Sequence, residues 1–180
     1  MFSEKYSASN PAYNVRPGLK FAFSHPAHTL ALFFGAGCLR PGPGTWGTWM
    51  VLVQFLSWKA LAVCIAVLFV LGALASEKTC RDLGVQDAGC VVVDEVAAVW
   101  LVCLMLPQNA IAWCAAFLAF RLFDIVKLPP ASWVDRKIHN GWGIMLDDLL
   151  AAVWAAVALV GIDMLCNRLF PGAGLFLGVF

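Results

Sequence analysis

The stretch CVVVDEVAAVWLVCLMLP, residues 90–107, has the composition of a membrane-embedded helix, yet it carries two adjacent carboxylates, Asp94 and Glu95. Carboxylates inside hydrocarbon are costly and mark functional sites. The whole chain of 180 residues is 62% hydrophobic and only 13% charged, which is unusual for a soluble domain. We therefore predict an all-α, polytopic helical membrane protein, in which the two carboxylates need a compensating environment.

Polar segments divide the apolar sequence around this stretch into about four to five expected membrane-embedded helices, with one further short or re-entrant segment near the N-terminus. A run of about 13 residues is short for crossing a bilayer, because a spanning helix needs about 20. SWK at 57–59 interrupts the long apolar run after Trp46, so we expect a hairpin there. The expected helices are 26–39 (short), 46–57, 60–76, 91–106, 110–126 and 146–169, with polar loops at 77–90 and 127–146.

The domain organisation predicted from this pattern is one membrane-embedded domain, 25–170, between two short flanking segments. Residues 1–24 form a cytoplasmic or interfacial segment without the apolar core of a signal peptide, and residues 171–180 form a tail. Lys and Arg concentrate in the N-terminal segment and in both polar loops, which predicts that these lie on the cytoplasmic side. Seven cysteines without a CxxC pair do not indicate a disulfide framework or a thiolate zinc site. The net charge of +1, with no basic tract, indicates no nucleic-acid partner.

The acidic residues are unevenly distributed, since nine of the 11 lie between Glu77 and Asp148. In the predicted topology the helix from 91 begins at the cytoplasmic face, the next helix ends there, and the last helix departs from it. We therefore expect five carboxylates in one layer, with the last two in the first turn of the final helix: Asp94, Glu95, Asp124, Asp147 and Asp148.

Five carboxylates at low dielectric repel one another and need cations. Mg²⁺ prefers oxygen ligands and typically binds one or two carboxylates together with substrate phosphate and water. The glycine-rich turn PGPGT, 41–45, precedes a predicted helix, and such a helix start can bind an anion. These features together predict metal-assisted phosphate chemistry, with Gly44, Thr45, Arg121, Lys127, Arg136 and His139 as candidate phosphate-binding residues.

Simpler explanations exist for each acidic feature taken singly. Asp94 and Glu95 can complement a helix dipole. Asp124 can pair within its own helix with Arg121, three residues before it, or with Lys127, three residues after it.

The remaining features have simpler explanations too. Asp147 and Asp148 can act as the cap and first-turn acid of a helix. PGPGT is more often an ordinary turn than a phosphate site, and Asp82, Asp87 and His139 can be loop residues. The convergence of four groups on one face of a chain poor in charge favours a shared functional site.

Four motifs in register resemble bacterial phosphatidylglycerophosphatase A: PGPGTWGT (41–48), DLGVQDAGCVVVDE (82–95), FRLFDIVK (120–127) and DRKIHNGWGIMLDD (135–148). The resemblance extends from about Pro26 to Leu169. Departures are Leu128-Pro129-Pro130 where the family has Pro-x-Pro after the lysine, Ala98 and Ala152 where it has glycines, and no basic residue near Ser132.

The resemblance implies a multi-pass, Mg²⁺-dependent phosphatase of the bacterial inner membrane, with its active site facing the cytoplasm. Its substrate would be phosphatidylglycerophosphate in the membrane, converted to phosphatidylglycerol and inorganic phosphate. Transferred by motif position, Arg121 and Lys127 would contact substrate, and Asp87 matches a further family position. The implied functional acids are Asp94, Glu95, Asp124, Asp147 and Asp148.

Metal-activated water is the expected nucleophile, because the chain has neither a Cys–Arg phosphate loop nor a DxDx(T/V) motif. Some of the five carboxylates would bind Mg²⁺, and a remaining one would orient or deprotonate water; spacing does not assign which. The catalytic candidates are Asp94, Glu95, Asp124 and Asp148. The alternative is a transporter or channel for a divalent cation or another ion, for which acids near the midplane and repeated halves are more typical. The oligomeric state does not follow from the sequence.

Overall fold

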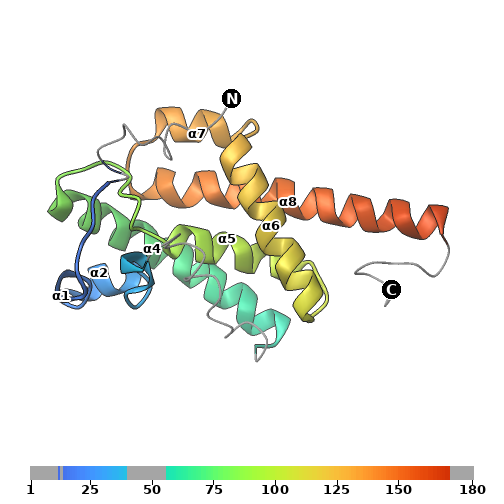
Figure 1. Cartoon of the computed structure of the whole chain (residues 1–180), viewed down its shortest axis with the longest axis horizontal. Coiled ribbons are helices and arrows are strands. Elements are labelled where there is room, and N and C mark those ends of the chain that lie inside the picture. The colour runs from blue at the N-terminus through green and yellow to red at the C-terminus, as the bar shows by residue number, and fades with distance from the viewer. Residues whose placement is uncertain (1–11, 13, 40–55, 171–180) are drawn as a thin grey trace.

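The structure is a computed structural model that describes residues 12, 14–39 and 56–170, and this part of the chain is helical without any strand. Figure 1 shows how the helices are arranged. Their bounds are α1 Leu19–Ala22, α2 Pro26–Ala31, the 3₁₀ helix η2 Ala36–Cys38, α4 Trp58–Leu83, α5 Val93–Leu104, α6 Ala110–Val126, α7 Ala131–Lys137 and α8 Gly141–Leu169. The all-α fold class is confirmed for these residues.

The N-terminal half of α8 is the centre of the helix packing. α8 packs against α4, α5, α6 and α7, while α2 packs mainly on α4. In Figure 1, α6 crosses α8 and the C-terminal half of α8 extends away from the other helices. The starts of α5 and α8 and the end of α6 are thereby brought to one region of the bundle.

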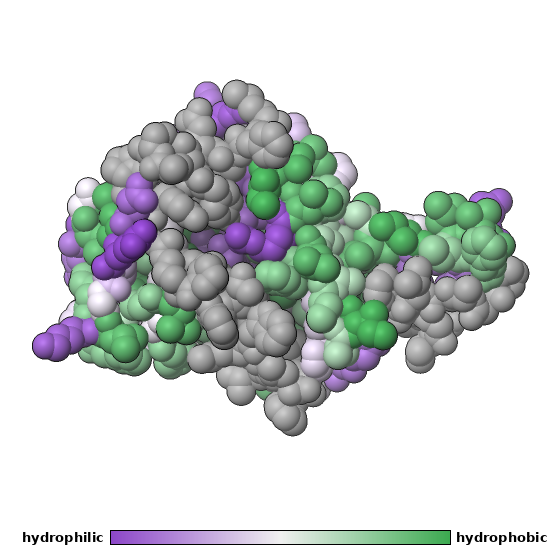
Figure 2. All heavy atoms as spheres, in the orientation of Figure 1, coloured by the Kyte–Doolittle hydropathy of each residue, from purple (hydrophilic) through white to green (hydrophobic). Residues whose placement is uncertain are grey.

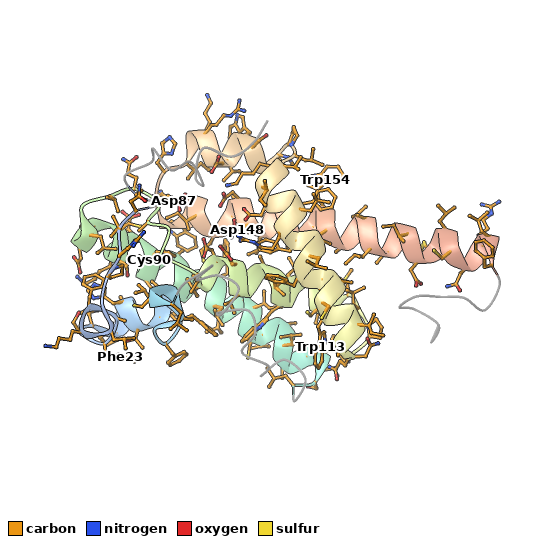
Figure 3. All side chains as sticks on the ribbon, viewed as in Figure 1. Phe23, Asp87, Cys90, Trp113, Asp148 and Trp154 are labelled. Atoms are coloured by element: carbon orange, nitrogen blue, oxygen red, sulfur yellow. The ribbon has the colours of Figure 1, made fainter. Side chains whose placement is uncertain are left out.

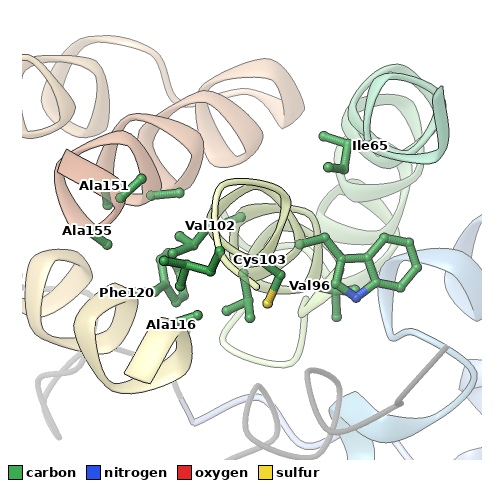
Figure 4. Packing of buried hydrophobic residues seen from close by; sticks show 14 of the residues in the cluster. Ile65, Val96, Val102, Cys103, Ala116, Phe120, Ala151 and Ala155 are labelled. Atoms are coloured by element: carbon green, nitrogen blue, oxygen red, sulfur yellow. The ribbon is translucent and has the colours of Figure 1, made fainter. Parts of the chain in front are cut away.

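Small side chains allow α5, α6 and α8 to approach closely. Ala116 on α6 and Ala151 and Ala155 on α8 are fully or almost fully buried, and Figure 4 shows them facing the α5 residues Val102 and Cys103. Small residues at helix interfaces permit close backbone approach in membrane proteins. Close approach lets polar side chains on three different helices reach one another near the helix ends.

Two helices, α4 and α8, are long and apolar enough to cross a membrane. The other helices are shorter, since α5 has 12 residues and α6 has 17. Four to five spans therefore remain a prediction, while membrane association rests on these two helices. Many large apolar side chains point outward, as expected against lipid, among them Val63, Val67, Leu74, Ile111, Leu118, Val157 and Ile162. Figure 2 shows apolar residues over the projecting half of α8 and hydrophilic ones near the middle of this face.

The prediction that a polar loop begins at residue 77 is wrong, because α4 continues as a helix to Leu83. Ion pairs at i,i+4 spacing, Lys78–Asp82 at 2.8 Å and Arg81–Glu77 at 3.3 Å, support these last turns. Gly84 then ends the helix in the left-handed conformation that glycine readily adopts. The start of α4 agrees with the predicted break, because Ser57 is its N-cap; the other arm of the predicted hairpin lies mostly outside the described residues.

The last helix begins at Gly141, five residues before the predicted start at Leu146, so Asp147 and Asp148 lie in its second turn and not in its first. The reason is the cap: the Asn140 side chain accepts a hydrogen bond from the Gly143 amide at 3.0 Å. The simpler interpretation of the two acids as cap and first-turn residues is therefore wrong.

Three other segments differ in detail from the predicted pattern. The predicted short helix 26–39 is divided into α2 and η2 by Phe33, Phe34 and Gly35, all at positive φ. The predicted loop 127–146 contains α7, and the N-terminal segment 1–24 contains α1. The predicted domain boundaries at residues 25 and 170 remain predictions.

Candidate active site

The candidate site contains five buried carboxylates on α5, α6 and α8. The starts of α5 and α8 and the end of α6 lie in the same region. We call Asp94, Glu95, Asp124, Asp147 and Asp148 the acid layer; none is more than 6% exposed. Asp94 and Glu95 are in the first turn of α5, Asp124 is near the end of α6, and the other two are in the second turn of α8. Burying so many carboxylates is strongly unfavourable unless cations or hydrogen-bond donors compensate.

Arg121 joins two helices of the acid layer. Its Nη1 lies 2.9 Å from Oε2 of Glu95 on α5 and 3.2 Å from Oδ2 of Asp124 on its own helix. The predicted pairing of Arg121 with Asp124 is thus present, but it forms part of a contact between helices. The guanidinium donates a hydrogen bond to Asp124 and forms an ion pair with Glu95, so it links α5 and α6.

Lys127 joins the end of α6 to α7 and α8. Its Nζ donates to Oδ2 of Asp147 and lies 2.7 Å from Oδ1 of Asp135 on α7. The Lys127 side chain is almost wholly buried, and its backbone takes a left-handed conformation with φ of 44° at the C-cap of α6. The chain therefore turns at Lys127, and the ammonium group lies among carboxylates from two helices.

Asp94 and Asp148 are fully buried, with no exposed surface. Figure 3 labels Asp148 in the part of α8 that lies close to α5. α5 and α8 are in extensive contact, which is consistent with acidic residues from both helices lining one interior region. The topological prediction that acids from different helix ends meet in one layer is supported by the Arg121 and Lys127 contacts.

The start of α8 is fixed against α4 by a direct contact. The Gly141 amide donates a 2.7 Å hydrogen bond to Oε2 of Glu77. A β-carbon at position 141 would lie 1.9 Å from the Ala73 carbonyl oxygen, so only glycine fits there. This contact sets the depth at which Asp147 and Asp148 enter the bundle.

Not every predicted site residue lies in the acid layer. Arg136 and His139 are exposed, on α7 and in the turn before α8 respectively. Asp87 is half-buried in the loop before α5 with a φ of 50°. Gly44 and Thr45 lie outside the described residues, so their predicted contact with phosphate remains a prediction.

Sequence reasoning did not identify Glu77 and Asp135 as contributors to the site. Glu77 belongs to a predicted loop, but in the structure it is in α4 and accepts a hydrogen bond from the start of α8. Asp135 has no predicted role, and in the structure it contacts Lys127. The spacing of eight residues between Lys127 and Asp135 gives no helical signal, because a turn separates them.

The donor set suits Mg²⁺ in its chemistry, since it consists of carboxylate oxygens. Within the described ranges, no group of three or more His, Cys, Asp and Glu side chains is arranged to hold a metal ion. Mg²⁺ does not require such a group, because it usually keeps several waters and binds one or two carboxylates plus substrate phosphate. The chemistry of the donor set is therefore compatible with Mg²⁺, and Mg²⁺ binding remains a prediction.

The two alanines that replace family glycines are compatible with this arrangement. Ala98 on α5 and Ala152 on α8 are both fully buried in the main apolar cluster. Their methyl groups are therefore accommodated in the core.

Comparison with known proteins agrees with the motif resemblance. The family model described as Phosphatidylglycerophosphatase A matches residues 29–163. The chain is 39% identical to Phosphatidylglycerophosphatase A of Haemophilus influenzae over 154 residues, covering 82% of this chain and 94% of that protein. It is 36% identical to Phosphatidylglycerophosphatase A of Escherichia coli over 143 residues, covering 76% and 83%.

A third relative has a different name. The chain is 33% identical to a "Putative phosphatidylinositol-3-phosphatase" of Bacteroides thetaiotaomicron over 139 residues, covering 70% of this chain and 86% of that protein. No solved structure matches the chain. The matched region includes every residue of the acid layer together with Arg121 and Lys127, and the chain therefore belongs to the phosphatidylglycerophosphatase A family of phosphatases.

Proposed function

We propose that this protein hydrolyses the terminal phosphate monoester of phosphatidylglycerophosphate, releasing phosphatidylglycerol and inorganic phosphate in a Mg²⁺-dependent reaction. The observation that carries the proposal is the acid layer with Arg121 and Lys127 inside it, in a chain of this family. Buried carboxylates can hold a divalent cation, and the two basic groups can bind a phosphate. Two relatives bear the name of this activity.

The Mg²⁺ ion would be held by carboxylates of Asp94, Glu95, Asp124, Asp147 and Asp148. Bound there, Mg²⁺ supplies Lewis-acid polarisation of the phosphate and lowers the pKa of a coordinated water. Glu95, Asp124 and Asp147 each contact Arg121 or Lys127 in the structure, so their orientation is already defined.

The basic residues have a role that follows from their charge. Arg121 and Lys127 would neutralise the phosphate oxygens as negative charge builds up in the transition state. Gly44 and Thr45 are proposed to bind the same phosphate, and the exposed Arg136 and His139 to meet the headgroup as it approaches. One carboxylate of Asp94, Glu95, Asp124 and Asp148 would accept the proton of the attacking water.

The site would lie near a membrane surface. Two of its acids, Asp147 and Asp148, lie in the second turn of α8, which with α4 is able to span a bilayer. Acyl chains could then remain in the bilayer while the headgroup reaches the carboxylates. From the distribution of Lys and Arg we propose that this surface is the cytoplasmic face of a bacterial inner membrane.

The transporter alternative is not favoured by this arrangement. A transport pathway is typically built at the bilayer midplane from repeated halves. The acid layer instead collects at helix ends, in the first turn of α5, the last turns of α6 and the second turn of α8.

A phosphate-release assay on the protein purified in detergent tests the proposal. We expect release from phosphatidylglycerophosphate with Mg²⁺, none with EDTA, and recovery when Mg²⁺ is added back. Phosphatidylinositol 3-phosphate serves as the comparison substrate, because one relative carries that name. Absence of release with Mg²⁺, or equal release with EDTA, contradicts the proposal, and faster hydrolysis of the inositol lipid reassigns the substrate.

A further inference from the structure

Two hydroxyl groups on α4 are buried without a hydrogen-bond partner. Ser76 and Thr79 have no exposed surface, and Oγ of Ser76 and Oγ1 of Thr79 contact no donor or acceptor in the part of the chain that the structure describes. A hydroxyl in a helix often bonds to the carbonyl one turn earlier, and neither does so here. Buried polar groups are nearly always satisfied, so an unsatisfied pair requires an explanation.

The two hydroxyls lie on the face of α4 that meets the starts of α5 and α8. Gly72, one turn before Ser76, is so close to these helices that a β-carbon there would lie 2.9 Å from Sδ of Met145 and 3.4 Å from Cγ1 of Val93. At the other end of this face, Sγ of Cys80 accepts a hydrogen bond from the Ala88 amide at 3.4 Å. Ser76 and Thr79 lie between these contacts on the same helical face, because residues 72, 76 and 79 follow the i, i+4, i+7 pattern.

The neighbouring positions belong to the acid layer. Val93 directly precedes Asp94 in the first turn of α5, and Met145 lies three residues before Asp148, on the same face of α8. The unsatisfied hydroxyls therefore face the region where the carboxylates enter the bundle. Carboxylates offer only acceptors, whereas a hydroxyl can donate a hydrogen bond without adding charge.

Two indole N–H groups, those of Trp100 and Trp113, also have no partner within the described segments. Their surroundings differ, since both rings pack in the apolar cluster around Val96 and Phe120. The large apolar area of an indole ring compensates for one unsatisfied N–H group. A serine or threonine side chain has no comparable area, so the same explanation does not apply to α4.

We propose that Ser76 and Thr79 are phosphate-binding residues that donate hydrogen bonds to phosphate oxygens entering the acid layer. The proposal rests on the proposed function and extends it, because it adds a neutral pair of donors from α4 to Arg121 and Lys127. Neutral donors suit a site crowded with carboxylates, since they bind an anion without forming ion pairs with the acids. Free phosphate and the phosphate of the lipid headgroup present the same oxygens to these hydroxyls.

The test uses the variants Thr79→Val and Ser76→Ala in the full chain, with inorganic phosphate and Mg²⁺ as the probe. Removing an unsatisfied buried hydroxyl by a substitution of similar or smaller shape is neutral or stabilising. We therefore expect each melting temperature without phosphate to be unchanged or raised by roughly 2–4 °C. The rise in melting temperature that phosphate induces should be smaller in each variant than in the wild type. The Ki of phosphate as product inhibitor should rise on the order of tenfold.

Two control variants separate ligand binding from a structural role. Thr29→Val removes a hydroxyl that is already bonded, at 2.8 Å, to the Ala22 carbonyl, so it should lower the melting temperature and leave the phosphate-induced shift unchanged. Thr79→Ser keeps the hydroxyl and should restore the wild-type Ki. A parallel rise of KM for phosphatidylglycerophosphate in Thr79→Val shows that the lipid phosphate uses the same donors; an unchanged KM limits them to the released phosphate.

Opposite results overturn the inference. If Thr79→Val and Ser76→Ala both lower the melting temperature without phosphate, the hydroxyls are satisfied within the protein and have a structural role. If both keep the wild-type shift and Ki, they do not contact phosphate. The wild-type assay with phosphatidylglycerophosphate is independent of these outcomes, so failure of the proposed function and failure of this inference are distinguishable.

Discussion

Arg121 of α6 and Glu95 of α5 lie 2.9 Å apart, Nη1 to Oε2, and the same nitrogen reaches Asp124 at 3.2 Å. One guanidinium thus fixes carboxylates of two helices in a region with little solvent. If Arg121 binds phosphate during catalysis, its positive charge must serve both the acids and the substrate.

Arg121→Lys keeps the charge but removes the guanidinium group, whose Nη1 contacts both carboxylates. We expect kcat/KM for phosphatidylglycerophosphate to fall by about 10²–10³-fold, as for loss of one transition-state donor. The matched control is Arg81→Gln, which removes an exposed ion pair with Glu77 and should leave activity near that of the wild type. Equal activity of Arg121→Lys and the wild type would show that Arg121 has only a structural role.

Asp94→Asn removes a fully buried carboxylate charge from the first turn of α5 with almost no change in shape. We expect a loss of turnover of at least about 10²-fold, together with a weaker dependence of the remaining rate on Mg²⁺. Asp82→Asn is the control, because Asp82 lies near the end of α4 and pairs with Lys78 and His28. Full activity of Asp94→Asn at low Mg²⁺ would show that Asp94 only complements the dipole at the start of α5.

Lys127→Met leaves Asp147 and Asp135 without the ammonium group that contacts both. Removal of one partner from a buried ion pair typically costs about 3–5 kcal/mol, so a large drop in melting temperature is expected. The double variant Lys127→Met/Asp147→Asn should recover part of that stability, because no charged carboxylate is then left at position 147. Both variants should lack phosphatase activity. Activity in the double variant would argue against a role of Lys127 in substrate binding.

Gly141→Ala tests the close contact between α8 and α4. The new β-carbon would lie 1.9 Å from the Ala73 carbonyl oxygen and 2.8 Å from the Glu77 amide, so the start of α8 must move. We expect lower thermal stability and lower activity, because Asp147 and Asp148 would shift with the helix. Gly161→Ala in the same helix meets no atom within 4 Å and should be neutral or stabilising by roughly 0.5–1 kcal/mol.

Much of the fold could be predicted from hydropathy. The boundaries of α6 and the acidic first turn of α5 agree with prediction because apolar runs bounded by polar turns define them. The end of α4 and the start of α8 differ from the prediction for a local reason. Charged pairs at i,i+4 spacing extend α4 beyond its apolar run. The Asn140 cap starts α8 before its apolar run begins. In both places the change in polarity along the sequence does not coincide with the helix boundary.

The sequence by itself determined the helical class, the acidic set and the family, because composition and motif spacing are properties of the chain. Only the tertiary structure decided which charges meet. Glu95 lies 26 residues before Arg121, and Lys127 lies 20 residues before Asp147, and these pairs form because close helix packing brings separate helix ends together. The stretch at 90–107 shows this division: its carboxylates predict a site, and α6 supplies the Arg121 guanidinium that pairs with the buried Glu95.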